Sequence, residues 1–325
     1  MRIAPGLLLF VALLAPFGYG AGADREELRL VMVVSRHGVR PPTADANRAM
    51  GKYAAQPWPK WEVPDGYLTP HGKHLMQLMG EYYRAVYTRE GLLTGDAGRD
   101  AARIFFRADS DERTIESALG LAAGLLPGRP VEVQALAGGA DDPLFHSLMA
   151  HVGRPDLALA EAELRGRIGG DAGIPVTACG ASLALLERVL LGTEGPPPVG
   201  KSLVSAEAAR IAPDPRAGQM ATLAGPLLIG HRCAEDFLLE YTDAKPAAEV
   251  GWGRVDRRTL EQLLALEAIY SDLTETAPYR ARAQASNLAS HLLATLEQGA
   301  RDRPVPGAIG GPAARLVIVS AHPAL

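Results

Sequence analysis

A run of five apolar residues, Leu30–Val34, ends abruptly in a polar segment that contains Arg36, His37 and Arg40. Val-rich runs of this length are typical of buried strands, especially parallel strands that are covered on both faces. In open α/β sheets, ligands bind beyond the carboxyl ends of such strands. The sequence therefore predicts an α/β fold with a binding site that begins at His37.

Two arginines flank His37 at positions −1 and +3, and this pattern is suited to an anion. The planar guanidinium group donates pairs of hydrogen bonds to phosphate oxygens, and its charge is not lost at physiological pH. A phosphoryl group at this strand end would meet Arg36, Arg40 and the imidazole of His37. Solvated arginines at a polar strand end are the alternative interpretation of the same short pattern.

Residues 1–23 have the pattern of a secretory signal peptide. Arg2 is followed by the apolar stretch Leu7–Ala15 and by the small residues Ala21, Gly22 and Ala23. Nine uninterrupted apolar residues are too few to span a bilayer. We expect cleavage near Ala23 and a periplasmic or secreted product that has no membrane contact.

The charge balance excludes some classes of partner. The chain carries 33 Lys and Arg against 37 Asp and Glu, a net charge of −4, and so lacks the basic surplus of proteins that bind nucleic acid or anionic lipid. The two cysteines, Cys179 and Cys233, have no metal-ligand spacing, and the sequence leaves their pairing open. We expect no metal or other cofactor, a small-molecule phosphate ester as the partner, and no nucleic acid; the oligomeric state stays open.

A second predicted strand, Arg103–Ala108, leads into the polar segment Asp109–Thr114 and then into a helix. Asp109 and Glu112 have the spacing of a capping box, so one interpretation is that these acids only start the helix. Arg113 does not fit that interpretation, because a cation in the first turn opposes the helix dipole unless an anion is bound there. We therefore expect Arg113 to contact a ligand.

The remaining patterns divide the chain. Segments 24–149 and 271–325 predict an α/β domain with a mostly parallel sheet flanked by helices, whereas 150–270 predicts an inserted all-helical domain. His231 and Glu235 lie one helical turn apart, which favours a surface pair for His231. The predicted helices are Lys73–Tyr87 (beginning near Pro70), Asp156–Arg167, Leu183–Leu191, Gly218–Tyr241 and Arg258–Tyr270.

Three segments together resemble the signatures of the histidine acid phosphatases, in the branch that includes bacterial phytases and glucose-1-phosphatases. They are RHGVRPPT from Arg36, ADSDERT from Ala108, and the apolar strand Arg315–Ser320 followed by His322. The resemblance implies a histidine-phosphatase-like fold, with substrate bound between the two domains and a phosphohistidine formed on His37. It also implies substrate contacts from Arg36, Arg40, Thr43, Asp109, Arg113, Glu235 and the catalytic His322.

The terminal strand departs from the family pattern, in which a Gly-His-Asp step provides an aspartate that protonates the leaving alcohol. Here Pro323 follows His322, and relatives continue further, so we expect a C-terminally truncated member. Proline has no proton to give, and Asp109 or Glu235 could replace the aspartate only with suitable geometry. We expect an acid phosphatase for sugar or inositol phosphates with impaired turnover of alkyl esters. The alternatives are an inactive phosphate-ester binding protein or an incomplete gene product.

Overall fold

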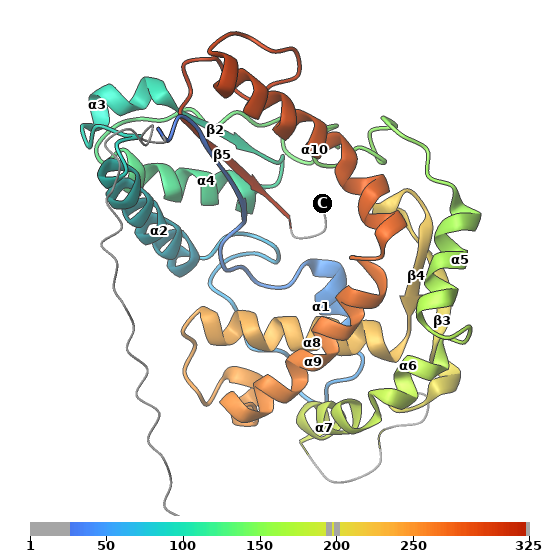
Figure 1. The fold of residues 1–325 in the computed structure, drawn as a ribbon. Coiled ribbons are helices and arrows are strands. Elements are labelled where there is room, and N and C mark those ends of the chain that lie inside the picture. The colour runs from blue at the N-terminus through green and yellow to red at the C-terminus, as the bar shows by residue number, and fades with distance from the viewer. Residues whose placement is uncertain (1–26, 193–196, 198–201, 323–325) are drawn as a thin grey trace, which may run out of the picture.

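The computed structural model describes residues 27–192, 197 and 202–322. The predicted signal peptide, 1–23, and Pro323 lie outside these residues. Within them, an α/β part built on a parallel sheet stands beside a largely helical part (Figure 1).

Three strands form the central sheet in the order β1 (Val31–Arg36), β5 (Leu316–Ala321) and β2 (Ile104–Ala108). Both pairings are parallel. The middle strand, β5, is buried along its whole length, which accounts for its uninterrupted apolar sequence. The prediction of a parallel sheet in an α/β fold is confirmed.

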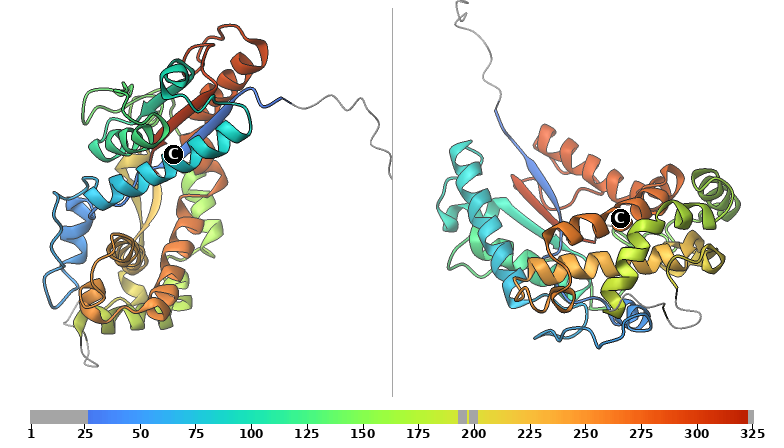
Figure 2. Two further views of the ribbon diagram at one scale, coloured as in Figure 1. Left: turned by 90° about the vertical axis from the view of Figure 1, so that its left-hand side faces the viewer. Right: turned by 90° about the horizontal axis from the view of Figure 1, so that it is seen from below.

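Helices cover both faces of the sheet, as predicted (Figures 1 and 2). The side chains of β5 alternate between a core shared with α2 (Pro70–Arg89) and α4 (Glu112–Leu125) and a second core shared with α10 (Pro278–Arg301). Helix α2 begins at the predicted proline, where Thr69 accepts a hydrogen bond from the backbone N–H of Gly72. In the part of the chain that the structure describes, no helix is long and apolar enough to cross a membrane.

Helices α2 and α4 cross closely at two glycines. A Cβ atom on Gly80 would lie 2.2 Å from the carbonyl oxygen of Leu121, and a Cβ atom on Gly124 would lie 2.1 Å from that of Gln77. No side chain fits at either position, so the two glycines allow the helix backbones to approach more closely than other residues would. The crossing fixes α2 and α4 relative to each other.

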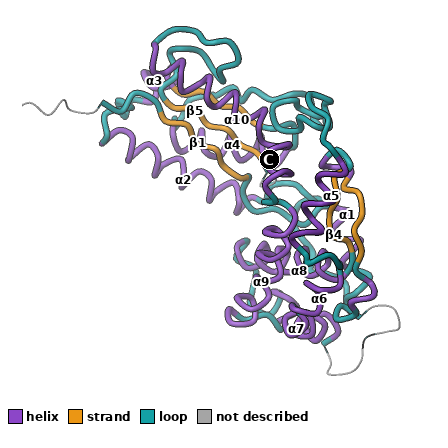
Figure 3. Tube along the Cα trace, turned by 45° about the vertical axis from the view of Figure 1, so that its right-hand side comes forward, coloured by secondary structure: helices purple, strands orange, loops and turns teal. Residues whose placement is uncertain are grey.

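The helical part has its own core, which includes both cysteines as free, buried thiols. Met50 at the end of α1 (Ala44–Met50) and the nearby Trp58 also pack into it, so this core draws on residues outside the predicted 150–270 range. Figure 3 shows how this part lies beyond the sheet. Its main helices are α5 (Leu157–Arg167), α6 (Gly173–Ala178), α7 (Gly180–Leu191), α8 (Pro226–Thr242) and α9 (Arg257–Thr274).

The insertion is not helical throughout. Strands β3 (Arg210–Asp214) and β4 (Met220–Ala224) form an antiparallel hairpin, so the single helix predicted at Gly218–Tyr241 is wrong in its first part. Gly225, with a φ of 106°, separates β4 from α8, and Pro226 then starts the helix. Short helices complete the structure at Ala97–Asp100 (α3), Ala101–Arg103, Ala206–Ala208, Pro215–Ala217 and Val250–Gly253.

Candidate active site

The carboxyl ends of the three sheet strands bring the predicted residues together. His37 follows β1, Asp109 follows β2 and His322 follows β5. Backbone hydrogen bonds continue the strand register into this region: His37 N donates to Ala321 O at 3.1 Å, and Asp109 N donates to Ser320 O at 3.0 Å. The strand ends point toward the helical part (Figures 1 and 3).

His37 is a neutral imidazole with one nitrogen free to attack. Its Nδ1 lies 2.8 Å from the carbonyl oxygen of Gly38, which can only accept, so Nδ1 carries the hydrogen and Nε2 keeps its lone pair. Burial lowers the pKa of His37 from 6.5 to about 2, and the charges of Arg40 and Arg36 add to this effect. The ring therefore stays unprotonated in mildly acidic solution.

The turn after His37 is held against two helices. The N–H of Gly38 donates to Ser117 Oγ of α4 at 2.8 Å. A Cβ atom on Gly38 would lie 3.0 Å from the carbonyl oxygen of Gly72 in α2, and Thr69 N donates to Val39 O at 3.0 Å. The segment that leads to the second arginine is thereby fixed in place.

Glu235 of α8 binds both arginines of the first motif. Its Oε1 accepts a hydrogen bond from Arg36 and lies 3.6 Å from Nη2 of Arg40. Burial raises the pKa of Glu235, but the charges of Arg40 and Arg36 outweigh it, so the pKa is lowered overall. Burial lowers the pKa of Arg40 to about 10, and its Nε is buried without a hydrogen-bond partner among the described residues. One carboxylate thus faces two guanidinium groups, which leaves positive charge for an anion.

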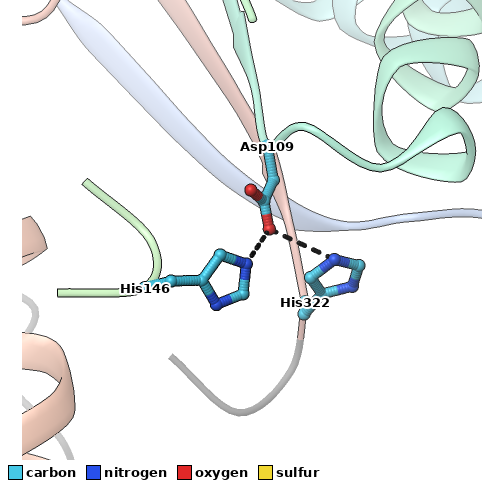
Figure 4. A group of neighbouring side chains, drawn as sticks. All are labelled: Asp109, His146 and His322. Carbon is cyan, nitrogen blue, oxygen red and sulfur yellow. Dashed lines mark hydrogen bonds and ion pairs between the residues drawn. The ribbon is translucent and has the colours of Figure 1, made fainter. Parts of the chain in front are cut away.

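Asp109 holds two histidines on the other side of the site (Figure 4). Its carboxylate is fully buried, and Oδ2 lies 2.7 Å from Nε2 of His146 and 3.2 Å from Nε2 of His322. Burial raises the pKa of Asp109, but hydrogen bonds from the two histidines outweigh it and hold the pKa well below its usual value. The hydrogen bond to Asp109 in turn raises the pKa of His146. Asp109 is therefore an ionised carboxylate that favours a protonated imidazole beside it.

The capping-box interpretation is wrong. Helix α4 begins at Glu112 after Asp111, whose side chain makes no capping hydrogen bond, and Asp109 is engaged by the histidines. Glu112 Oε2 instead accepts from the backbone N–H of Leu68 at 2.9 Å. This glutamate ties the segment before α2 to the start of α4.

Arg113 contacts His322 and the segment before α2. Its Nη1 donates to the carbonyl oxygen of Gly66 at 3.2 Å, and its Nη2 donates to Asp111 Oδ2 at 2.6 Å and lies 3.4 Å from Nε2 of His322. The ring centroids of His322 and His37 are 5.4 Å apart. Like that of Arg40, the Nε of Arg113 is buried without a partner in the described part of the chain. The structure thus places all three arginines around the His37–His322 pair.

Two predicted residues have other neighbours. Thr43 caps α1, where its Oγ1 accepts from Ala46 N at 3.5 Å, and its role toward substrate stays a prediction. His231 is half-buried and stacks on Tyr270 with ring centroids 4.6 Å apart, so the predicted surface pair with Glu235 is wrong. Tyr270 lies on α9, which packs against α8.

Sequence reasoning missed His146 and Asp111. His146 lies in a loop that is 37 residues beyond Asp109, and no spacing rule links the two. Asp111 Oδ2 lies 2.9 Å from Nε2 of His322. The available signal was its place in the same polar segment as Arg113.

Asp109, His146 and His322 also have the donor types of a metal site, with one ligand atom each and all three atoms within 4.8 Å of one another. Both Nε2 atoms already use Asp109 Oδ2 as a hydrogen-bond partner, and the charge of Arg113 lies 3.4 Å from His322. A divalent cation there would be repelled by that charge. The ionised carboxylates of Asp109 and Asp111 act in the opposite direction, and the expectation of no metal stays a prediction.

An unprotonated imidazole surrounded by guanidinium groups beyond a parallel strand is suited to bind phosphoryl groups. Residues 27–159 match the histidine phosphatase superfamily (branch 2). This match covers the part of the chain that carries His37 and Asp109, and the comparisons support a phosphoric monoester hydrolase.

Several known proteins are similar to the chain over most of its length. Phytase AppA of Escherichia coli (strain K12) is 29% identical over 292 residues, which cover 88% of this chain and 67% of the phytase. A glucose-1-phosphatase of Salmonella typhimurium is 27% identical over 90% of this chain and 69% of its own length. The crystal structure of Klebsiella sp ASR1 phytase matches with a TM-score of 0.77 at 26% identity, over 91% of this chain and 69% of the phytase. A Hafnia alvei phytase in complex with tartrate matches with a TM-score of 0.77 at 28% identity, covering 91% and 72% of the two chains.

Proposed function

We propose that this protein is an acid phosphatase, exported to the periplasm or secreted, that hydrolyses small phosphate monoesters such as sugar or inositol phosphates through a phosphohistidine on His37. The observation that carries the proposal is the unprotonated, buried ring of His37 among Arg36, Arg40 and Arg113. The similarity to phytases and glucose-1-phosphatases supports the substrate class.

In the first step, the Nε2 lone pair of His37 attacks phosphorus and the bond from phosphorus to the ester oxygen breaks. The ring becomes positively charged, and the hydrogen bond from Nδ1 to Gly38 stabilises this charge. The arginines neutralise the oxygens of the transferring group, where a pair of unit charges 4 Å apart contributes about 4 kcal/mol at an effective dielectric of 20. In the second step, water attacks phosphorus, the P–N bond breaks and phosphate leaves.

The leaving oxygen also needs a proton, and the two acids considered from the sequence do not supply one. The pKa of Asp109 and the pKa of Glu235 are both lowered, because histidines hold the first carboxylate and arginines hold the second. Pro323 has no acidic proton. Turnover of alkyl esters that is slower than turnover of aryl esters is therefore part of the proposal.

Trapping of the covalent intermediate tests the proposal. The protein is mixed with radiolabelled p-nitrophenyl phosphate and denatured rapidly in base. We expect label that is stable in base and lost in acid, no label in His37→Ala, and normal label in the matched control His291→Ala on α10. Ester binding without label or phosphate release would contradict the proposal and favour the binding-protein alternative.

Export is tested separately by expressing the full chain in a Gram-negative host and sequencing the N-terminus of the product. We expect a periplasmic protein that begins after Ala23. An uncleaved chain that stays in the cytoplasm would contradict this part of the proposal.

A further inference from the structure

We infer that His146 is the general acid of the reaction: its imidazolium, held by Asp109, protonates the ester oxygen as the substrate is cleaved. This inference rests on the proposed function. It assigns a catalytic role to a residue outside every motif of the sequence, in a chain where Pro323 follows His322 in the sequence and has no proton to give.

The position of His146 suits this role (Figure 4). Its ring centroid lies 6.0 Å from that of His322, which lies 5.4 Å from that of His37. The side chain of His146 is 30% exposed, whereas the side chain of Asp109 is fully buried. A ligand bound beside His322 can therefore reach the imidazole of His146 but not the carboxylate behind it.

The nitrogen that would donate is Nδ1. Nε2 of His146 is engaged by Asp109 at 2.7 Å, while Nδ1 makes no hydrogen bond to any residue that the structure describes and points away from Asp109 (Figure 4). A carboxylate bonded to one ring nitrogen fixes the tautomer and stabilises the imidazolium, as in the Asp–His pair of serine proteases. The second nitrogen is then free to transfer a proton.

The loop that carries His146 is anchored to two elements. The carboxylate of Asp142 forms a salt bridge with Arg107 of β2, and Asn287 of α10 donates to the carbonyl oxygen of Pro143 at 2.7 Å. His146 N donates to Asp142 O at 2.7 Å. The imidazole is thus held in a fixed position relative to the strand ends, which a general acid requires.

The proton balance closes over the cycle. As the P–O bond breaks, its electron pair goes to the leaving oxygen, which takes the Nδ1 proton and departs as a neutral alcohol. His146 becomes a neutral imidazole that keeps its Nε2 hydrogen on Asp109. When water attacks the phosphohistidine, His146 accepts the proton released by that water, and the imidazolium is restored.

The other carboxyl groups of the site do not fit this task. Asp109, Asp111 and Glu235 all have a lowered pKa, so they hold no proton in mildly acidic solution. Burial raises the pKa of Asp236 well above its usual value, but this residue is 1% exposed and has no route to a ligand. By contrast, the hydrogen bond to Asp109 raises the pKa of His146.

The test compares two esters that differ in their need for an acid. The leaving group of p-nitrophenyl phosphate departs without a proton, whereas that of glucose 1-phosphate needs one. In His146→Asn, we expect kcat for glucose 1-phosphate to fall about 10²-fold more than kcat for p-nitrophenyl phosphate. The control His291→Asn, on α10 and bonded to Gly307 O at 2.6 Å, keeps both rates at the wild-type level.

A second measurement needs no variant. In the wild-type protein, kcat for glucose 1-phosphate should fall as the pH rises through the raised pKa of His146, and kcat for p-nitrophenyl phosphate should lack this basic limb. The charged and titratable groups around the ring are the carboxylates Asp109, Asp111, Asp141 and Asp142, the imidazole of His322, and the guanidinium groups of Arg107 and Arg113.

Equal losses of kcat with both esters would leave the ratio of the two kcat values unchanged. That result would overturn the role of His146 as acid and make it a positioning residue for Asp109. If His146→Asn shows no cooperative thermal melt, the wild-type pH comparison decides. A wild-type protein that forms no phosphoenzyme would defeat the proposed function and this inference with it. Labelled phosphoenzyme together with matching basic limbs for both esters would defeat the inference alone.

Discussion

The two sides of the site hold histidines in opposite charge states. On the side of β1, burial and the arginines lower the pKa of His37 to about 2, so the ring is a nucleophile. On the side of β2, the hydrogen bond to Asp109 raises the pKa of His146, so the ring is suited to carry a proton. Both residues are histidines, and the neighbouring charges and the burial of each ring determine whether it acts as a nucleophile or carries a proton. We call these sides the arginine side (Arg36, His37, Arg40, Glu235) and the carboxylate side (Asp109, Asp111, His146, His322).

The largest effect is expected on the arginine side, from His37→Ala. Loss of the nucleophile should lower kcat for p-nitrophenyl phosphate by about 10⁴-fold or more. Inorganic phosphate should still bind, because the three arginines remain, and calorimetry measures this. Residual kcat within tenfold of the wild type would mean that another group attacks phosphorus.

On the carboxylate side, Asp109→Asn should lower kcat for glucose 1-phosphate by about 10²-fold at pH 6. Loss of the carboxylate removes the hydrogen bond that raises the pKa of His146, so the basic limb of the pH profile should also move to lower pH. The matched variant Asp111→Asn should move this limb less, because Asp111 acts on His146 only through its charge and is bonded to Arg113 and His322 instead. A pH profile that is identical in Asp109→Asn and wild type would contradict the comparison.

Stability should depend on pH with opposite sign on the two sides. The unfolded chain binds a proton at His37 below about pH 6.5, whereas the folded protein binds one only near pH 2. This residue therefore costs about 2 kcal/mol of unfolding free energy between pH 7 and pH 5, and His37→Gln should abolish that loss.

His146 contributes stability below pH 6.5 that is lost as the pH rises through its raised pKa, and His146→Gln should remove this contribution. Urea denaturation of the two variants at several pH values measures both slopes. Equal slopes in the two variants would show that the charge states do not differ as described.

The smallest effect is expected from Glu235→Gln. Removal of this carboxylate leaves Arg36 and Arg40 uncompensated, so inorganic phosphate should bind about threefold to tenfold more tightly. Calorimetry at low ionic strength measures the change. Weaker binding would show instead that Glu235 is needed to hold the two arginines in position.

The arginine side was predictable from the sequence because its residues are neighbours in the chain. An apolar strand followed by Arg36, His37 and Arg40 places all three residues at one strand end. Arg113 was predictable because a cation is unfavourable in the first turn of a helix unless an anion is bound there. Burial in the folded structure is the largest cause of the lowered pKa of His37, and no local pattern shows this burial.

The carboxylate side was less predictable because it depends on tertiary contacts. The Asp109 partner His146 comes from a loop that folds back over the end of β2, and local rules made Asp109 a helix cap instead. The β3–β4 hairpin was missed for a similar reason. Met220 and Leu223 are three residues apart, which fits a helix, and pairing with β3 makes the segment a strand.

The glycine crossing of α2 and α4 fixes the relative positions of two helices that support the site. Arg113 lies in the first turn of α4, and the turn after His37 rests on the first turn of α2. A methyl group at Gly80 or Gly124 would push the helix axes apart and move Arg113 away from the imidazole of His322. Substitutions there would impair turnover even where the protein still folds, although neither glycine contacts a residue of the site.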